Sequence, residues 1–351
     1  MSTVFTLGMA LAGLPTGYLM SRFSRKAVVQ IGIFIFSAAT IVTVFSAGFV
    51  DMLFYRAVTG IGEAMQLTAL LAVFSSYFAR HRGLGVGAVN GTYGIGAIIG
   101  PRLGAHMLVD YGTWRAPMIA FGLIGLVFIG VVAAFVRPWL SEANRVVSNE
   151  EIALTGGAAT LRNRNTAVLL LLSVMGGLVT YGFLGMYPTF LREYLHYSPA
   201  DAGKVVSFYG FGALLSVAGG WLGDRFSPRL VLGCAMVAGA VVGYLLFHGP
   251  RDFFGQAVLA LAFGIVIGGT IYVNLAACHV RAVAGALADR AAGVFVTSFY
   301  TSASLAGFTI GWLANTWGWQ TAGDVQLVVL CLVGAVATLL LRPERMASRA
   351  D

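Results

Sequence analysis

The chain has 351 residues, of which 58% are hydrophobic and 10% are charged, and its mean hydropathy is +0.84. Average soluble domains carry roughly 25% charged residues, so this composition excludes a soluble globular protein. The formal net charge of +8 comes from basic residues spread over alternate loops. They form no patch, which excludes a nucleic-acid-binding domain.

Apolar stretches that are long enough to cross a lipid bilayer recur along the whole chain. Each helical span needs about 20 apolar residues, because the hydrocarbon core is about 30 Å thick. Helices are expected because the apolar runs are too long for barrel strands and do not alternate. The sequence therefore predicts an all-α membrane protein with eleven transmembrane helices, at residues 1–20, 27–47, 51–78, 84–108, 115–136, 166–191, 202–222, 229–248, 253–277, 291–313 and 321–341.

Lys and Arg are distributed unevenly between the two sets of loops. Sixteen lie on one side, and only Arg115, Arg192 and Arg251 lie on the other. Basic loops stay in the cytoplasm, so the long loop 137–165 and the C-terminus are predicted to be cytoplasmic and Met1 external. The Ala-, Gly- and Arg-rich composition is compatible with a GC-rich bacterium. We therefore expect a multi-pass protein of a bacterial inner membrane.

The two halves of the chain repeat one another. Residues 17–26 return as residues 220–229, and in both copies a Gly-rich apolar stretch leads into a short basic turn. Duplicated halves are typical of transporters. Because the longest polar loop separates five spans from six, we expect an N-terminal bundle at 1–136, a cytoplasmic linker at 137–165 and a C-terminal bundle at 166–351. A second set of pairs has an offset of 207 residues: Val89 with Val296, Tyr93 with Tyr300, Gly100 with Gly307 and Gly104 with Gly311.

The basic turn of each copy resembles the loop motif of the major facilitator superfamily, the large family of twelve-helix secondary transporters. That motif reads Gly-x-x-x-Asp-Arg-x-Gly-Arg-Arg/Lys. The first copy departs from it at Ser21 and Ser24 and otherwise matches it at Gly17, Arg22, Arg25 and Lys26, whereas the second copy keeps Gly220, Asp224 and Arg225. A carboxylate and a guanidinium between helix ends can hold one face of a transporter closed. A gate is therefore expected at Gly17, Arg22, Arg25, Gly220, Asp224 and Arg225.

Two further motifs of the same family are matched within predicted spans. The fourth-helix motif, Arg-x-x-x-Gly-x-Gly, is similar to the segment with Arg56, Gly60 and Gly62. The fifth-helix motif, whose small residues and proline allow close helix packing, is similar to Gly87, Gly96, Gly100, Pro101 and Gly104. In the family that motif is associated with antiporters, which implies export. The resemblance covers the whole chain and implies the major facilitator fold, with two pseudo-symmetric helical bundles and alternating access.

The resemblance also implies that one helix is missing. In the family's frame the first span here is the second helix, and the repeat agrees because the span at 166–191 has no partner in the first half. The family's first, fourth, seventh and tenth helices line the substrate cavity, so one wall is expected to be absent. We interpret Met1 as an internal methionine of a mis-assigned or truncated gene. A true eleven-helix protein is the alternative.

Arg56 and Glu63 are charged residues in the middle of a span. A buried charge there costs about 2.5–3.5 kcal/mol, so each needs a partner or an aqueous cavity. They are seven residues apart, which places them on the same helix face about 10 Å apart, too far for a direct ion pair. Burial favours a neutral carboxyl and a nearby cation favours a charged one. Glu63 and Arg56 are therefore candidates for proton coupling, against a purely structural role for each.

Arg102 interrupts the small-residue motif of its span. Its side chain either reaches the nearer membrane interface or faces the cavity, where a guanidinium binds carboxylate or phosphate. Polar uncharged residues gather on the spans expected to line the cavity, although such side chains also bond their own helix backbone. The substrate-binding candidates are Arg56, Arg102, Asn90, Tyr93, Tyr181, Tyr272, Asn274 and Tyr300.

The sequence contains no nucleotide-binding loop, metal cluster or nucleophile–base arrangement. We expect no enzyme activity, no metal and no cofactor. The preferred function is proton-coupled transport of a small organic solute. An organic anion is preferred because Arg56 opposes Glu63 within the spans, and Arg102 and Lys204 would add to this cationic excess. The alternative for Lys204, near the outer mouth, is an interfacial ion pair with Asp201. The alternatives are a proton-driven exporter of drug-like compounds and a truncated membrane protein without transport. The expected partners are a small-molecule substrate, protons and the lipid bilayer, and the expected state is a monomer.

Overall fold

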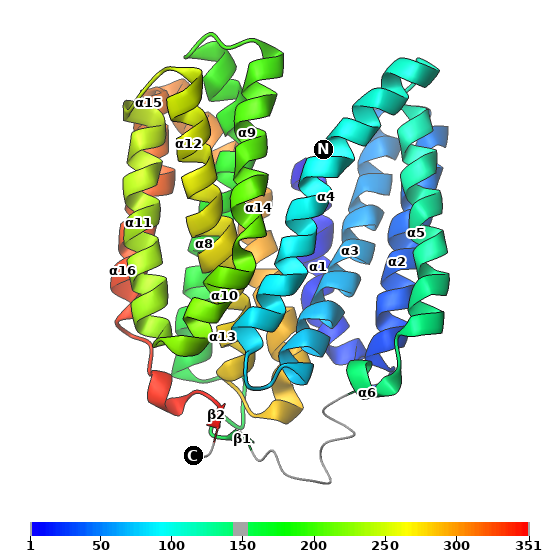
Figure 1. Ribbon diagram of the computed structural model, residues 1–351, viewed down its shortest axis with the longest axis vertical. Helices are drawn as coiled ribbons and strands as arrows, with labels where there is room; N and C mark the ends of the chain where they lie inside the picture. Colours follow the sequence, from blue (N-terminus) through cyan, green and yellow to red (C-terminus); the bar gives the residue numbers. More distant parts are fainter. Residues whose placement is uncertain (1, 143–153, 350–351) are drawn as a thin grey trace.

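The chain forms two helical bundles that stand side by side along a common long axis (Figure 1). The computed structural model describes residues 2–142 and 154–349. The first bundle contains α1 (Ser2–Leu19), α2 (Arg25–Val42), the short η1 (Thr43–Phe45), α3 (Phe49–Tyr77), α4 (Arg82–Tyr111) and α5 (Arg115–Phe135), and the single turn α6 (Pro138–Ser141) follows it.

The second bundle has six crossings, and several of them are built from more than one helical element. The π-helical segment η3 interrupts the fourth crossing near its middle, and η5 interrupts the last. The elements are α8 (Arg164–Glu193), α9 (Pro199–Leu214), α10 (Ser216–Arg225), α11 (Pro228–His248), α12 (Phe253–Phe263), η3 (Gly264–Tyr272), α13 (Val273–Arg281), η4 (Gly285–Leu287), α14 (Ala288–Trp317), α15 (Trp319–Gly323), η5 (Asp324–Val329), α16 (Leu330–Thr338) and η6 (Pro343–Arg345).

Each predicted span coincides with a helix or with a continuous run of helical elements. Within the described residues, nine of these crossings are long and apolar enough to traverse a membrane. The helix α1 is apolar but shorter, and α4 runs beside α3 between the same two ends of the molecule (Figure 1). The prediction of an all-α membrane protein with two helical bundles is confirmed.

The helices begin and end at residues suited to those positions. Ser24 precedes α2 and its Oγ accepts a hydrogen bond from the Ala27 amide, while Asn163 precedes α8 and accepts one from the Thr166 amide. Such caps satisfy amides that have no partner within the helix. Gly112 ends α4 with a φ of 64°, a conformation that glycine adopts without steric cost. Polar turns therefore divide the apolar runs where the sequence predicts.

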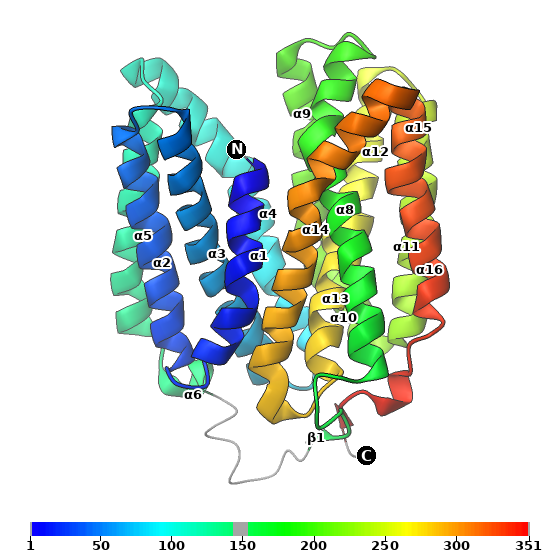
Figure 2. The same ribbon diagram turned by 180° about the vertical axis from the view of Figure 1, so that it is seen from behind.

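The bundles contact each other along a first seam, between α1 and α14, which lie side by side in Figure 2. Thr297 joins the two helices: its hydroxyl donates to the Ala10 carbonyl at 2.9 Å and accepts from the Leu14 amide at 2.8 Å. A Cβ atom at Gly13 would lie 2.7 Å from the Thr297 nitrogen, and one at Gly17 would lie 2.8 Å from the Asp289 carbonyl oxygen. Glycine is required at both positions because the two backbones approach so closely.

A second seam joins α4 to α10 and the end of α9. The Ser216 hydroxyl donates to the Gly87 carbonyl at 2.8 Å, and Gly83 and Gly220 place their backbones against each other. Farther along α4, a Cβ atom at Gly96 would meet nothing within 4 Å. Ala97 and Ile98 still approach Gly210 of α9, but a Cβ atom at Gly100 would again meet nothing, so the close contact along α4 covers its half nearer the Ser216–Gly87 bond.

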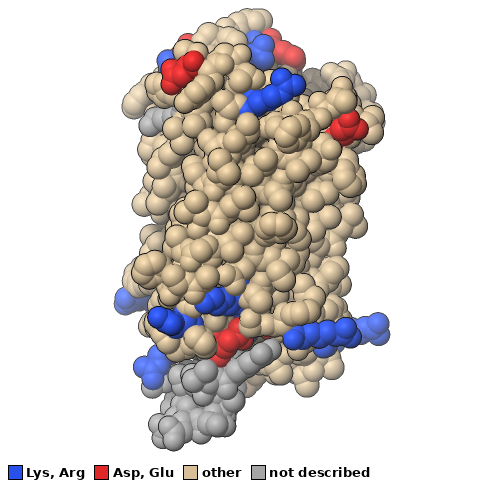
Figure 3. Space-filling view, turned by 90° about the vertical axis from the view of Figure 1, so that its right-hand side faces the viewer, with Lys and Arg blue, Asp and Glu red and all other residues tan. Residues whose placement is uncertain are grey.

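That half lies toward the end of the molecule that carries most of the basic turns. Figure 3 shows Lys and Arg gathered near this end, below a wide band of uncharged surface. We call it the basic end, and it carries the turn after α1, the turn after α3 and the chain after α16, with Arg22, Arg80 and Arg342. Two short strands, β1 (Leu154–Thr155) and β2 (Ser348–Arg349), pair there in an antiparallel arrangement.

Replacement of Gly60 by leucine tests how much the first bundle depends on close packing. A Cβ atom at Gly60 in α3 would collide with the Phe5 carbonyl of α1. We expect Gly60→Leu to lower the thermal unfolding midpoint in detergent, at a cost of about 1–3 kcal/mol for overpacking. Gly130→Leu in α5 is the matched control, because nothing lies within 4 Å of a Cβ atom there. Equal midpoints for both variants would contradict the packing described here.

Candidate functional site

A cavity of about 450 Å³ lies between the two bundles. The first bundle contributes α3 and α4 to its lining, together with one residue of α2, and the second contributes α8, α9, η3 and α14. Its lining residues are Phe36, Glu63, Gln66, Leu67, Leu70, Leu71, Val89, Asn90, Thr92, Tyr93, Gly96, Thr180, Tyr181, Leu184, Tyr209, Ala213, Gly268, Tyr272, Phe299 and Tyr300.

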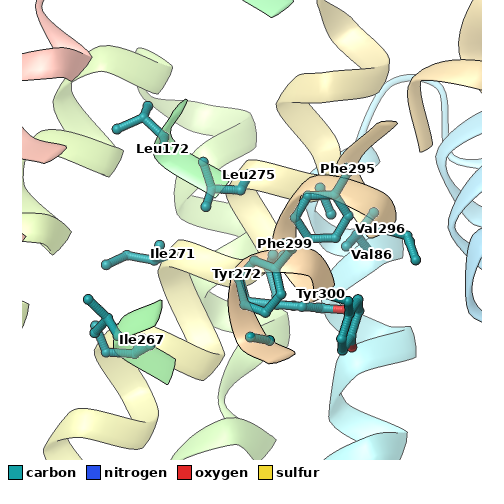
Figure 4. Packing of buried hydrophobic residues seen from close by; sticks show 14 of the residues in the cluster. Val86, Leu172, Ile267, Ile271, Tyr272, Leu275, Phe295, Val296, Phe299 and Tyr300 are labelled. Atoms are coloured by element: carbon teal, nitrogen blue, oxygen red, sulfur yellow. The ribbon is translucent and has the colours of Figure 1, made fainter. Parts of the chain in front are cut away.

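Aromatic rings form one wall of this cavity. The ring centroids of Tyr181 and Tyr300 are 5.8 Å apart, those of Tyr272 and Phe299 are 5.1 Å apart, and both pairs meet edge to face. The hydroxyl oxygens of Tyr272 and Tyr300 lie 3.5 Å apart. Figure 4 shows Tyr272, Phe299 and Tyr300 together, beyond the packed Phe295. A wall of this kind offers ring faces and edges for stacking, with phenol groups for hydrogen bonding.

Polar groups from both bundles reach the same space. The Asn90 amide of α4 donates to the Gly268 carbonyl of η3 at 3.0 Å and so connects the bundles across the cavity. Thr180 contributes a buried hydroxyl that has no hydrogen-bond partner within the described part of the chain. A buried polar atom without a partner costs free energy unless water or a bound molecule satisfies it. The cavity therefore has an open hydrogen-bonding position beside its aromatic wall.

Glu63 provides the carboxylate of the cavity. It lies on α3, and no hydrogen bond or ion pair to it occurs among the described residues, apart from longer-range attraction by Arg56. Arg56 is two helical turns farther from the basic end on the same helix, half-buried and outside the lining. The sequence-based expectation that the two side chains would not form a direct ion pair agrees with this arrangement.

The predicted substrate-binding residues are distributed between the cavity and other places. Five of the eight line it: Asn90, Tyr93, Tyr181, Tyr272 and Tyr300. Asn274 lies below it, where its amide donates to the Gly219 carbonyl at 2.9 Å and to the Thr270 carbonyl at 2.8 Å. Arg102 belongs to α4, but its side chain lies outside the described part of the structure, as does that of Pro101.

Several lining residues were not among the predicted candidates. Gln66 lies one turn after Glu63 on α3, Tyr209 lies on α9, and Phe299 directly precedes Tyr300 on α14. Spacing offered a signal for Gln66, because residues three apart on a helix share a face. Tyr209 and Phe299 carry no such signal, since aromatic residues in an apolar span are usually packed in a core.

An ion pair holds the two bundles together at the basic end. The Arg25 guanidinium, at the start of α2, donates to Asp289 Oδ1 at 2.6 Å from Nη2 and at 3.0 Å from Nε. Only 5% of Arg25 is exposed. The Arg25 amide also donates to Glu142 at 2.7 Å, which fixes the turn before α2. Because Asp289 lies in the first turn of α14, this contact closes the basic end beside the first seam.

A second carboxylate closes the other seam. Asp224, at the end of α10, accepts hydrogen bonds from the amides of Gly83 and Leu84 at 2.8 and 2.9 Å. These amides belong to the first turn of α4, where they have no partner within the helix and where the helix dipole favours negative charge. Asp224 is also within electrostatic reach of Arg82. We call the Arg25–Asp289 pair and the Asp224 contact the two clamps.

The other predicted gate residues surround the clamps. Arg22 is exposed in the turn after α1, and the Arg225 guanidinium lies 5.4 Å from the centre of the Trp221 ring. Gly17 and Gly220 lie within the seams. Of the predicted packing glycines, Gly87 contacts Ser216, Gly104 approaches Phe121 of α5, and Gly96 and Gly100 face open space.

Comparison with known proteins places this geometry in a family. The family model described as Major Facilitator Superfamily matches residues 1–307. The chain is 25% identical to the 4-hydroxybenzoate transporter PcaK of Pseudomonas aeruginosa over 98% of its length and 83% of that protein. It is 25% identical to the probable sulfoacetate transporter SauU of Cupriavidus necator, over 93% and 80% of the two chains. Its fold is similar to that of the human organic anion transporter MFSD10 (TETRAN), with a TM-score of 0.72, 16% identity, and coverage of 96% and 82%.

Loss of the ion-pair clamp is expected to open the basic end. In a variant whose three cysteines are replaced by serine, Thr92→Cys gives a thiol in the cavity lining. Arg25→Gln breaks a buried ion pair and leaves Asp289 as an unpaired charge, which destabilises the conformation closed at the basic end. Conformations that are closed at the opposite end then gain population. We therefore expect labelling of this thiol from the opposite end to slow by about tenfold. The rate of reaction with a membrane-impermeant maleimide measures the effect.

Two further variants make that result specific. Exchange of the charges, Arg25→Asp with Asp289→Arg, restores the attraction and is expected to recover most of the labelling rate. Arg22→Gln is the matched control, because Arg22 is exposed in the neighbouring turn. If Arg25→Gln and Arg22→Gln label alike, the clamp does not control access to the cavity.

Proposed function

The chain belongs to the major facilitator superfamily, and from this premise we propose that it is a secondary transporter of a small aromatic carboxylate. The observation that carries the proposal is the aromatic cavity between the two bundles, with Glu63 and the free Thr180 hydroxyl in its lining. Relatives named as transporters of 4-hydroxybenzoate and sulfoacetate support an organic anion as the substrate class.

The ring of the substrate is the part that the cavity is best suited to hold. Tyr181 and Tyr300 meet edge to face, as do Tyr272 and Phe299, which leaves ring faces and edges for a flat molecule to stack against. The Thr180 hydroxyl and the Tyr272–Tyr300 phenol pair offer hydrogen bonds to a ring substituent. The volume of about 450 Å³ falls within the range of small-molecule sites.

We propose that Arg56 of α3 and Arg102 of α4 meet the charge of the substrate on its way to the cavity, whose described lining contains no Lys or Arg. Arg56 lies two helical turns from Glu63 on α3, on the side away from the basic end. Arg102 lies nine residues beyond Tyr93 on α4, about 13 Å farther along the helix. A guanidinium on this approach attracts a carboxylate and pairs with it through two hydrogen bonds. Arg56 and Arg102 are therefore proposed to draw the anion toward the aromatic wall.

Glu63 is proposed to couple the anion to a proton. A bound carboxylate and an ionised Glu63 would place two negative charges in one cavity, an arrangement that like-charge repulsion disfavours. Binding of the anion therefore favours protonation of Glu63, and release of the anion favours loss of the proton.

In the proposed alternating access, the contacts between the bundles at the basic end break while new contacts form at the opposite end. In this conformation the clamps and seams close the basic end, whereas Gly96, Gly100 and Gly307 face open space toward the other end. When the clamps release, α4 and α14 are expected to close at these glycines. The positive-inside rule places the basic end in the cytoplasm, so the cavity here faces outward.

A bacterial inner membrane and a monomeric state remain part of the proposal.

Uptake of 4-hydroxybenzoate into proteoliposomes tests the proposal. We expect wild-type protein to accumulate the labelled acid when a proton gradient is imposed. Glu63→Gln is expected to abolish this accumulation but to preserve exchange of labelled for unlabelled acid, because a permanently neutral side chain binds the anion without carrying a proton. Glu193→Gln, an exposed carboxyl at the end of α8, is the control.

Tyr181→Ala separates ring recognition from coupling. Loss of its ring is expected to weaken both accumulation and exchange, raising KM about tenfold, since an edge-to-face partner and apolar contact area disappear together. If wild-type protein moves no aromatic carboxylate but expels cationic dyes, the protein is a drug exporter. If Glu63→Gln accumulates the acid as wild type does, Glu63 is not the proton carrier.

A further inference from the structure

A second cavity, of about 340 Å³, opens at the basic end of the C-terminal bundle, apart from the one between the bundles. Its lining combines three arginines with two asparagines and a short run of backbone, and its described part contains no Asp or Glu. The lining residues are Gly156, Gly157, Ala158, Asn163, Arg164, Asn165, Arg342 and Arg345. Net positive charge in a concave site indicates an anionic ligand.

The walls of this pocket are fixed by hydrogen bonds. The buried Asn165 side chain donates to the Arg342 carbonyl at 2.9 Å and accepts from the Arg342 amide at 2.8 Å. Arg164 Nε donates to the Leu340 carbonyl at 2.9 Å. The start of α8 and the chain after α16 are thereby held against each other. The arginines converge on one space although 178 residues separate Arg164 from Arg342 in the sequence.

Within the part of the chain that the structure describes, no acidic side chain pairs with Arg164, Arg342 or Arg345. The pocket also receives the amino-terminal end of α8, whose dipole favours negative charge. Gly156 and Gly157 adopt φ values of 98° and 80°, which lets the backbone turn tightly along the rim. Three arginines line this one space, and guanidinium groups are well suited to the several oxygens of a phosphate group.

We propose that this pocket binds a phosphate group, carried by an anionic lipid headgroup or by a soluble phosphate ester. The position of the pocket favours the lipid: Arg164 is the first residue of a membrane-spanning helix, so the pocket lies at the level of the headgroups. Exposed leucines of α8 and of the chain after α16 provide apolar surface for acyl chains, namely Leu170, Leu171, Leu339 and Leu340. These two segments lie side by side at the edge of the bundle in Figure 2.

Native mass spectrometry of the full-length protein tests the site with defined lipids. Phosphatidylglycerol and phosphatidylcholine of equal acyl chains are titrated onto wild-type protein and onto the triple variant Arg164→Gln, Arg342→Gln, Arg345→Gln. We expect wild type to retain one phosphatidylglycerol at least about tenfold more tightly than the triple variant does, and to show no such difference for phosphatidylcholine.

A second triple variant controls for the loss of charge. Arg80→Gln, Arg137→Gln, Arg162→Gln removes three exposed arginines at the basic end that do not line the pocket. This control is expected to bind phosphatidylglycerol as wild type does. If both triple variants lose binding equally, or neither does, the lipid binds a diffuse belt of charge and the proposal is wrong.

Competition by soluble glycerol phosphate distinguishes the two sources of the ligand. If millimolar glycerol phosphate leaves the bound lipid in place, the site is specific for the membrane lipid. If it displaces the lipid from wild type and binds only proteins with the three pocket arginines, the site recognises the phosphate group alone, and a soluble ester is its ligand. Folding of each variant is checked by its thermal unfolding midpoint. The pocket variant is expected to unfold within about 4 °C of wild type, because Arg164→Gln removes only the one hydrogen bond to the Leu340 carbonyl.

Discussion

Close contact between the two bundles is restricted to the basic end, and the cavity exists because that contact stops partway. Inside a bilayer, helices gain little from the hydrophobic effect on meeting, so packing of small residues and a few polar contacts decide where they touch. Gly13, Gly17, Gly87 and Gly220 remove the side chains that would hold the backbones apart. The clamps then add charge at the helix ends. Where the glycines face open space, the bundles separate and leave room for a ligand.

The two clamps are related by the repeat, but their charges are exchanged. Asp224 aligns with Ser21 at the offset of 203 residues, and Asp289 aligns with Arg82 at the offset of 207. In the second copy the acid therefore lies in the basic turn and faces the amides that follow Arg82. In the first copy the basic turn supplies the cation, Arg25, and the acid that it meets, Asp289, lies at the start of α14 in the second bundle. Ser21 thus stands where the family's loop motif has a carboxylate, and the carboxylate of this clamp is Asp289 of the opposite bundle.

The fold was predictable because a bilayer imposes one dominant rule. Every apolar run of about 20 residues has to be helical, and each predicted span is a helix or a run of helical elements. The site was predictable only in part, because the rule does not say which face of a helix meets the cavity. Asn90 and Asn274 give the same signal in the sequence, an amide within a span. Only Asn90 lines the cavity, whereas Asn274 bonds to backbone carbonyls near Gly223.

An irregular helix explains why helical periodicity does not predict that Asn90 lines the cavity and Asn274 does not. The π-helical η3 has more residues per turn than an α-helix, so the residues that follow it point to other faces than an α-helical periodicity predicts. It brings the Gly268 carbonyl and Tyr272 to the cavity, and it rotates Asn274 toward α10. The clamp at Asp289 was also beyond the sequence. Its partner Arg25 is 264 residues away, and pairing at that distance depends on how whole helices dock.

The start of α14 is where these separate features meet. Asp289 lies in its first turn, and the segment just before it pairs with the end of the linker: the Ala158 amide donates to the Ala282 carbonyl, and the Ala284 amide donates to the Ala158 carbonyl. The Ala347 amide, after α16, donates to the Arg281 carbonyl at 2.7 Å. A single short segment therefore carries a clamp and is bonded to both the linker and the C-terminal chain. The turn that leads into α14 and to Asp289 is therefore held by backbone hydrogen bonds from two other segments of the chain.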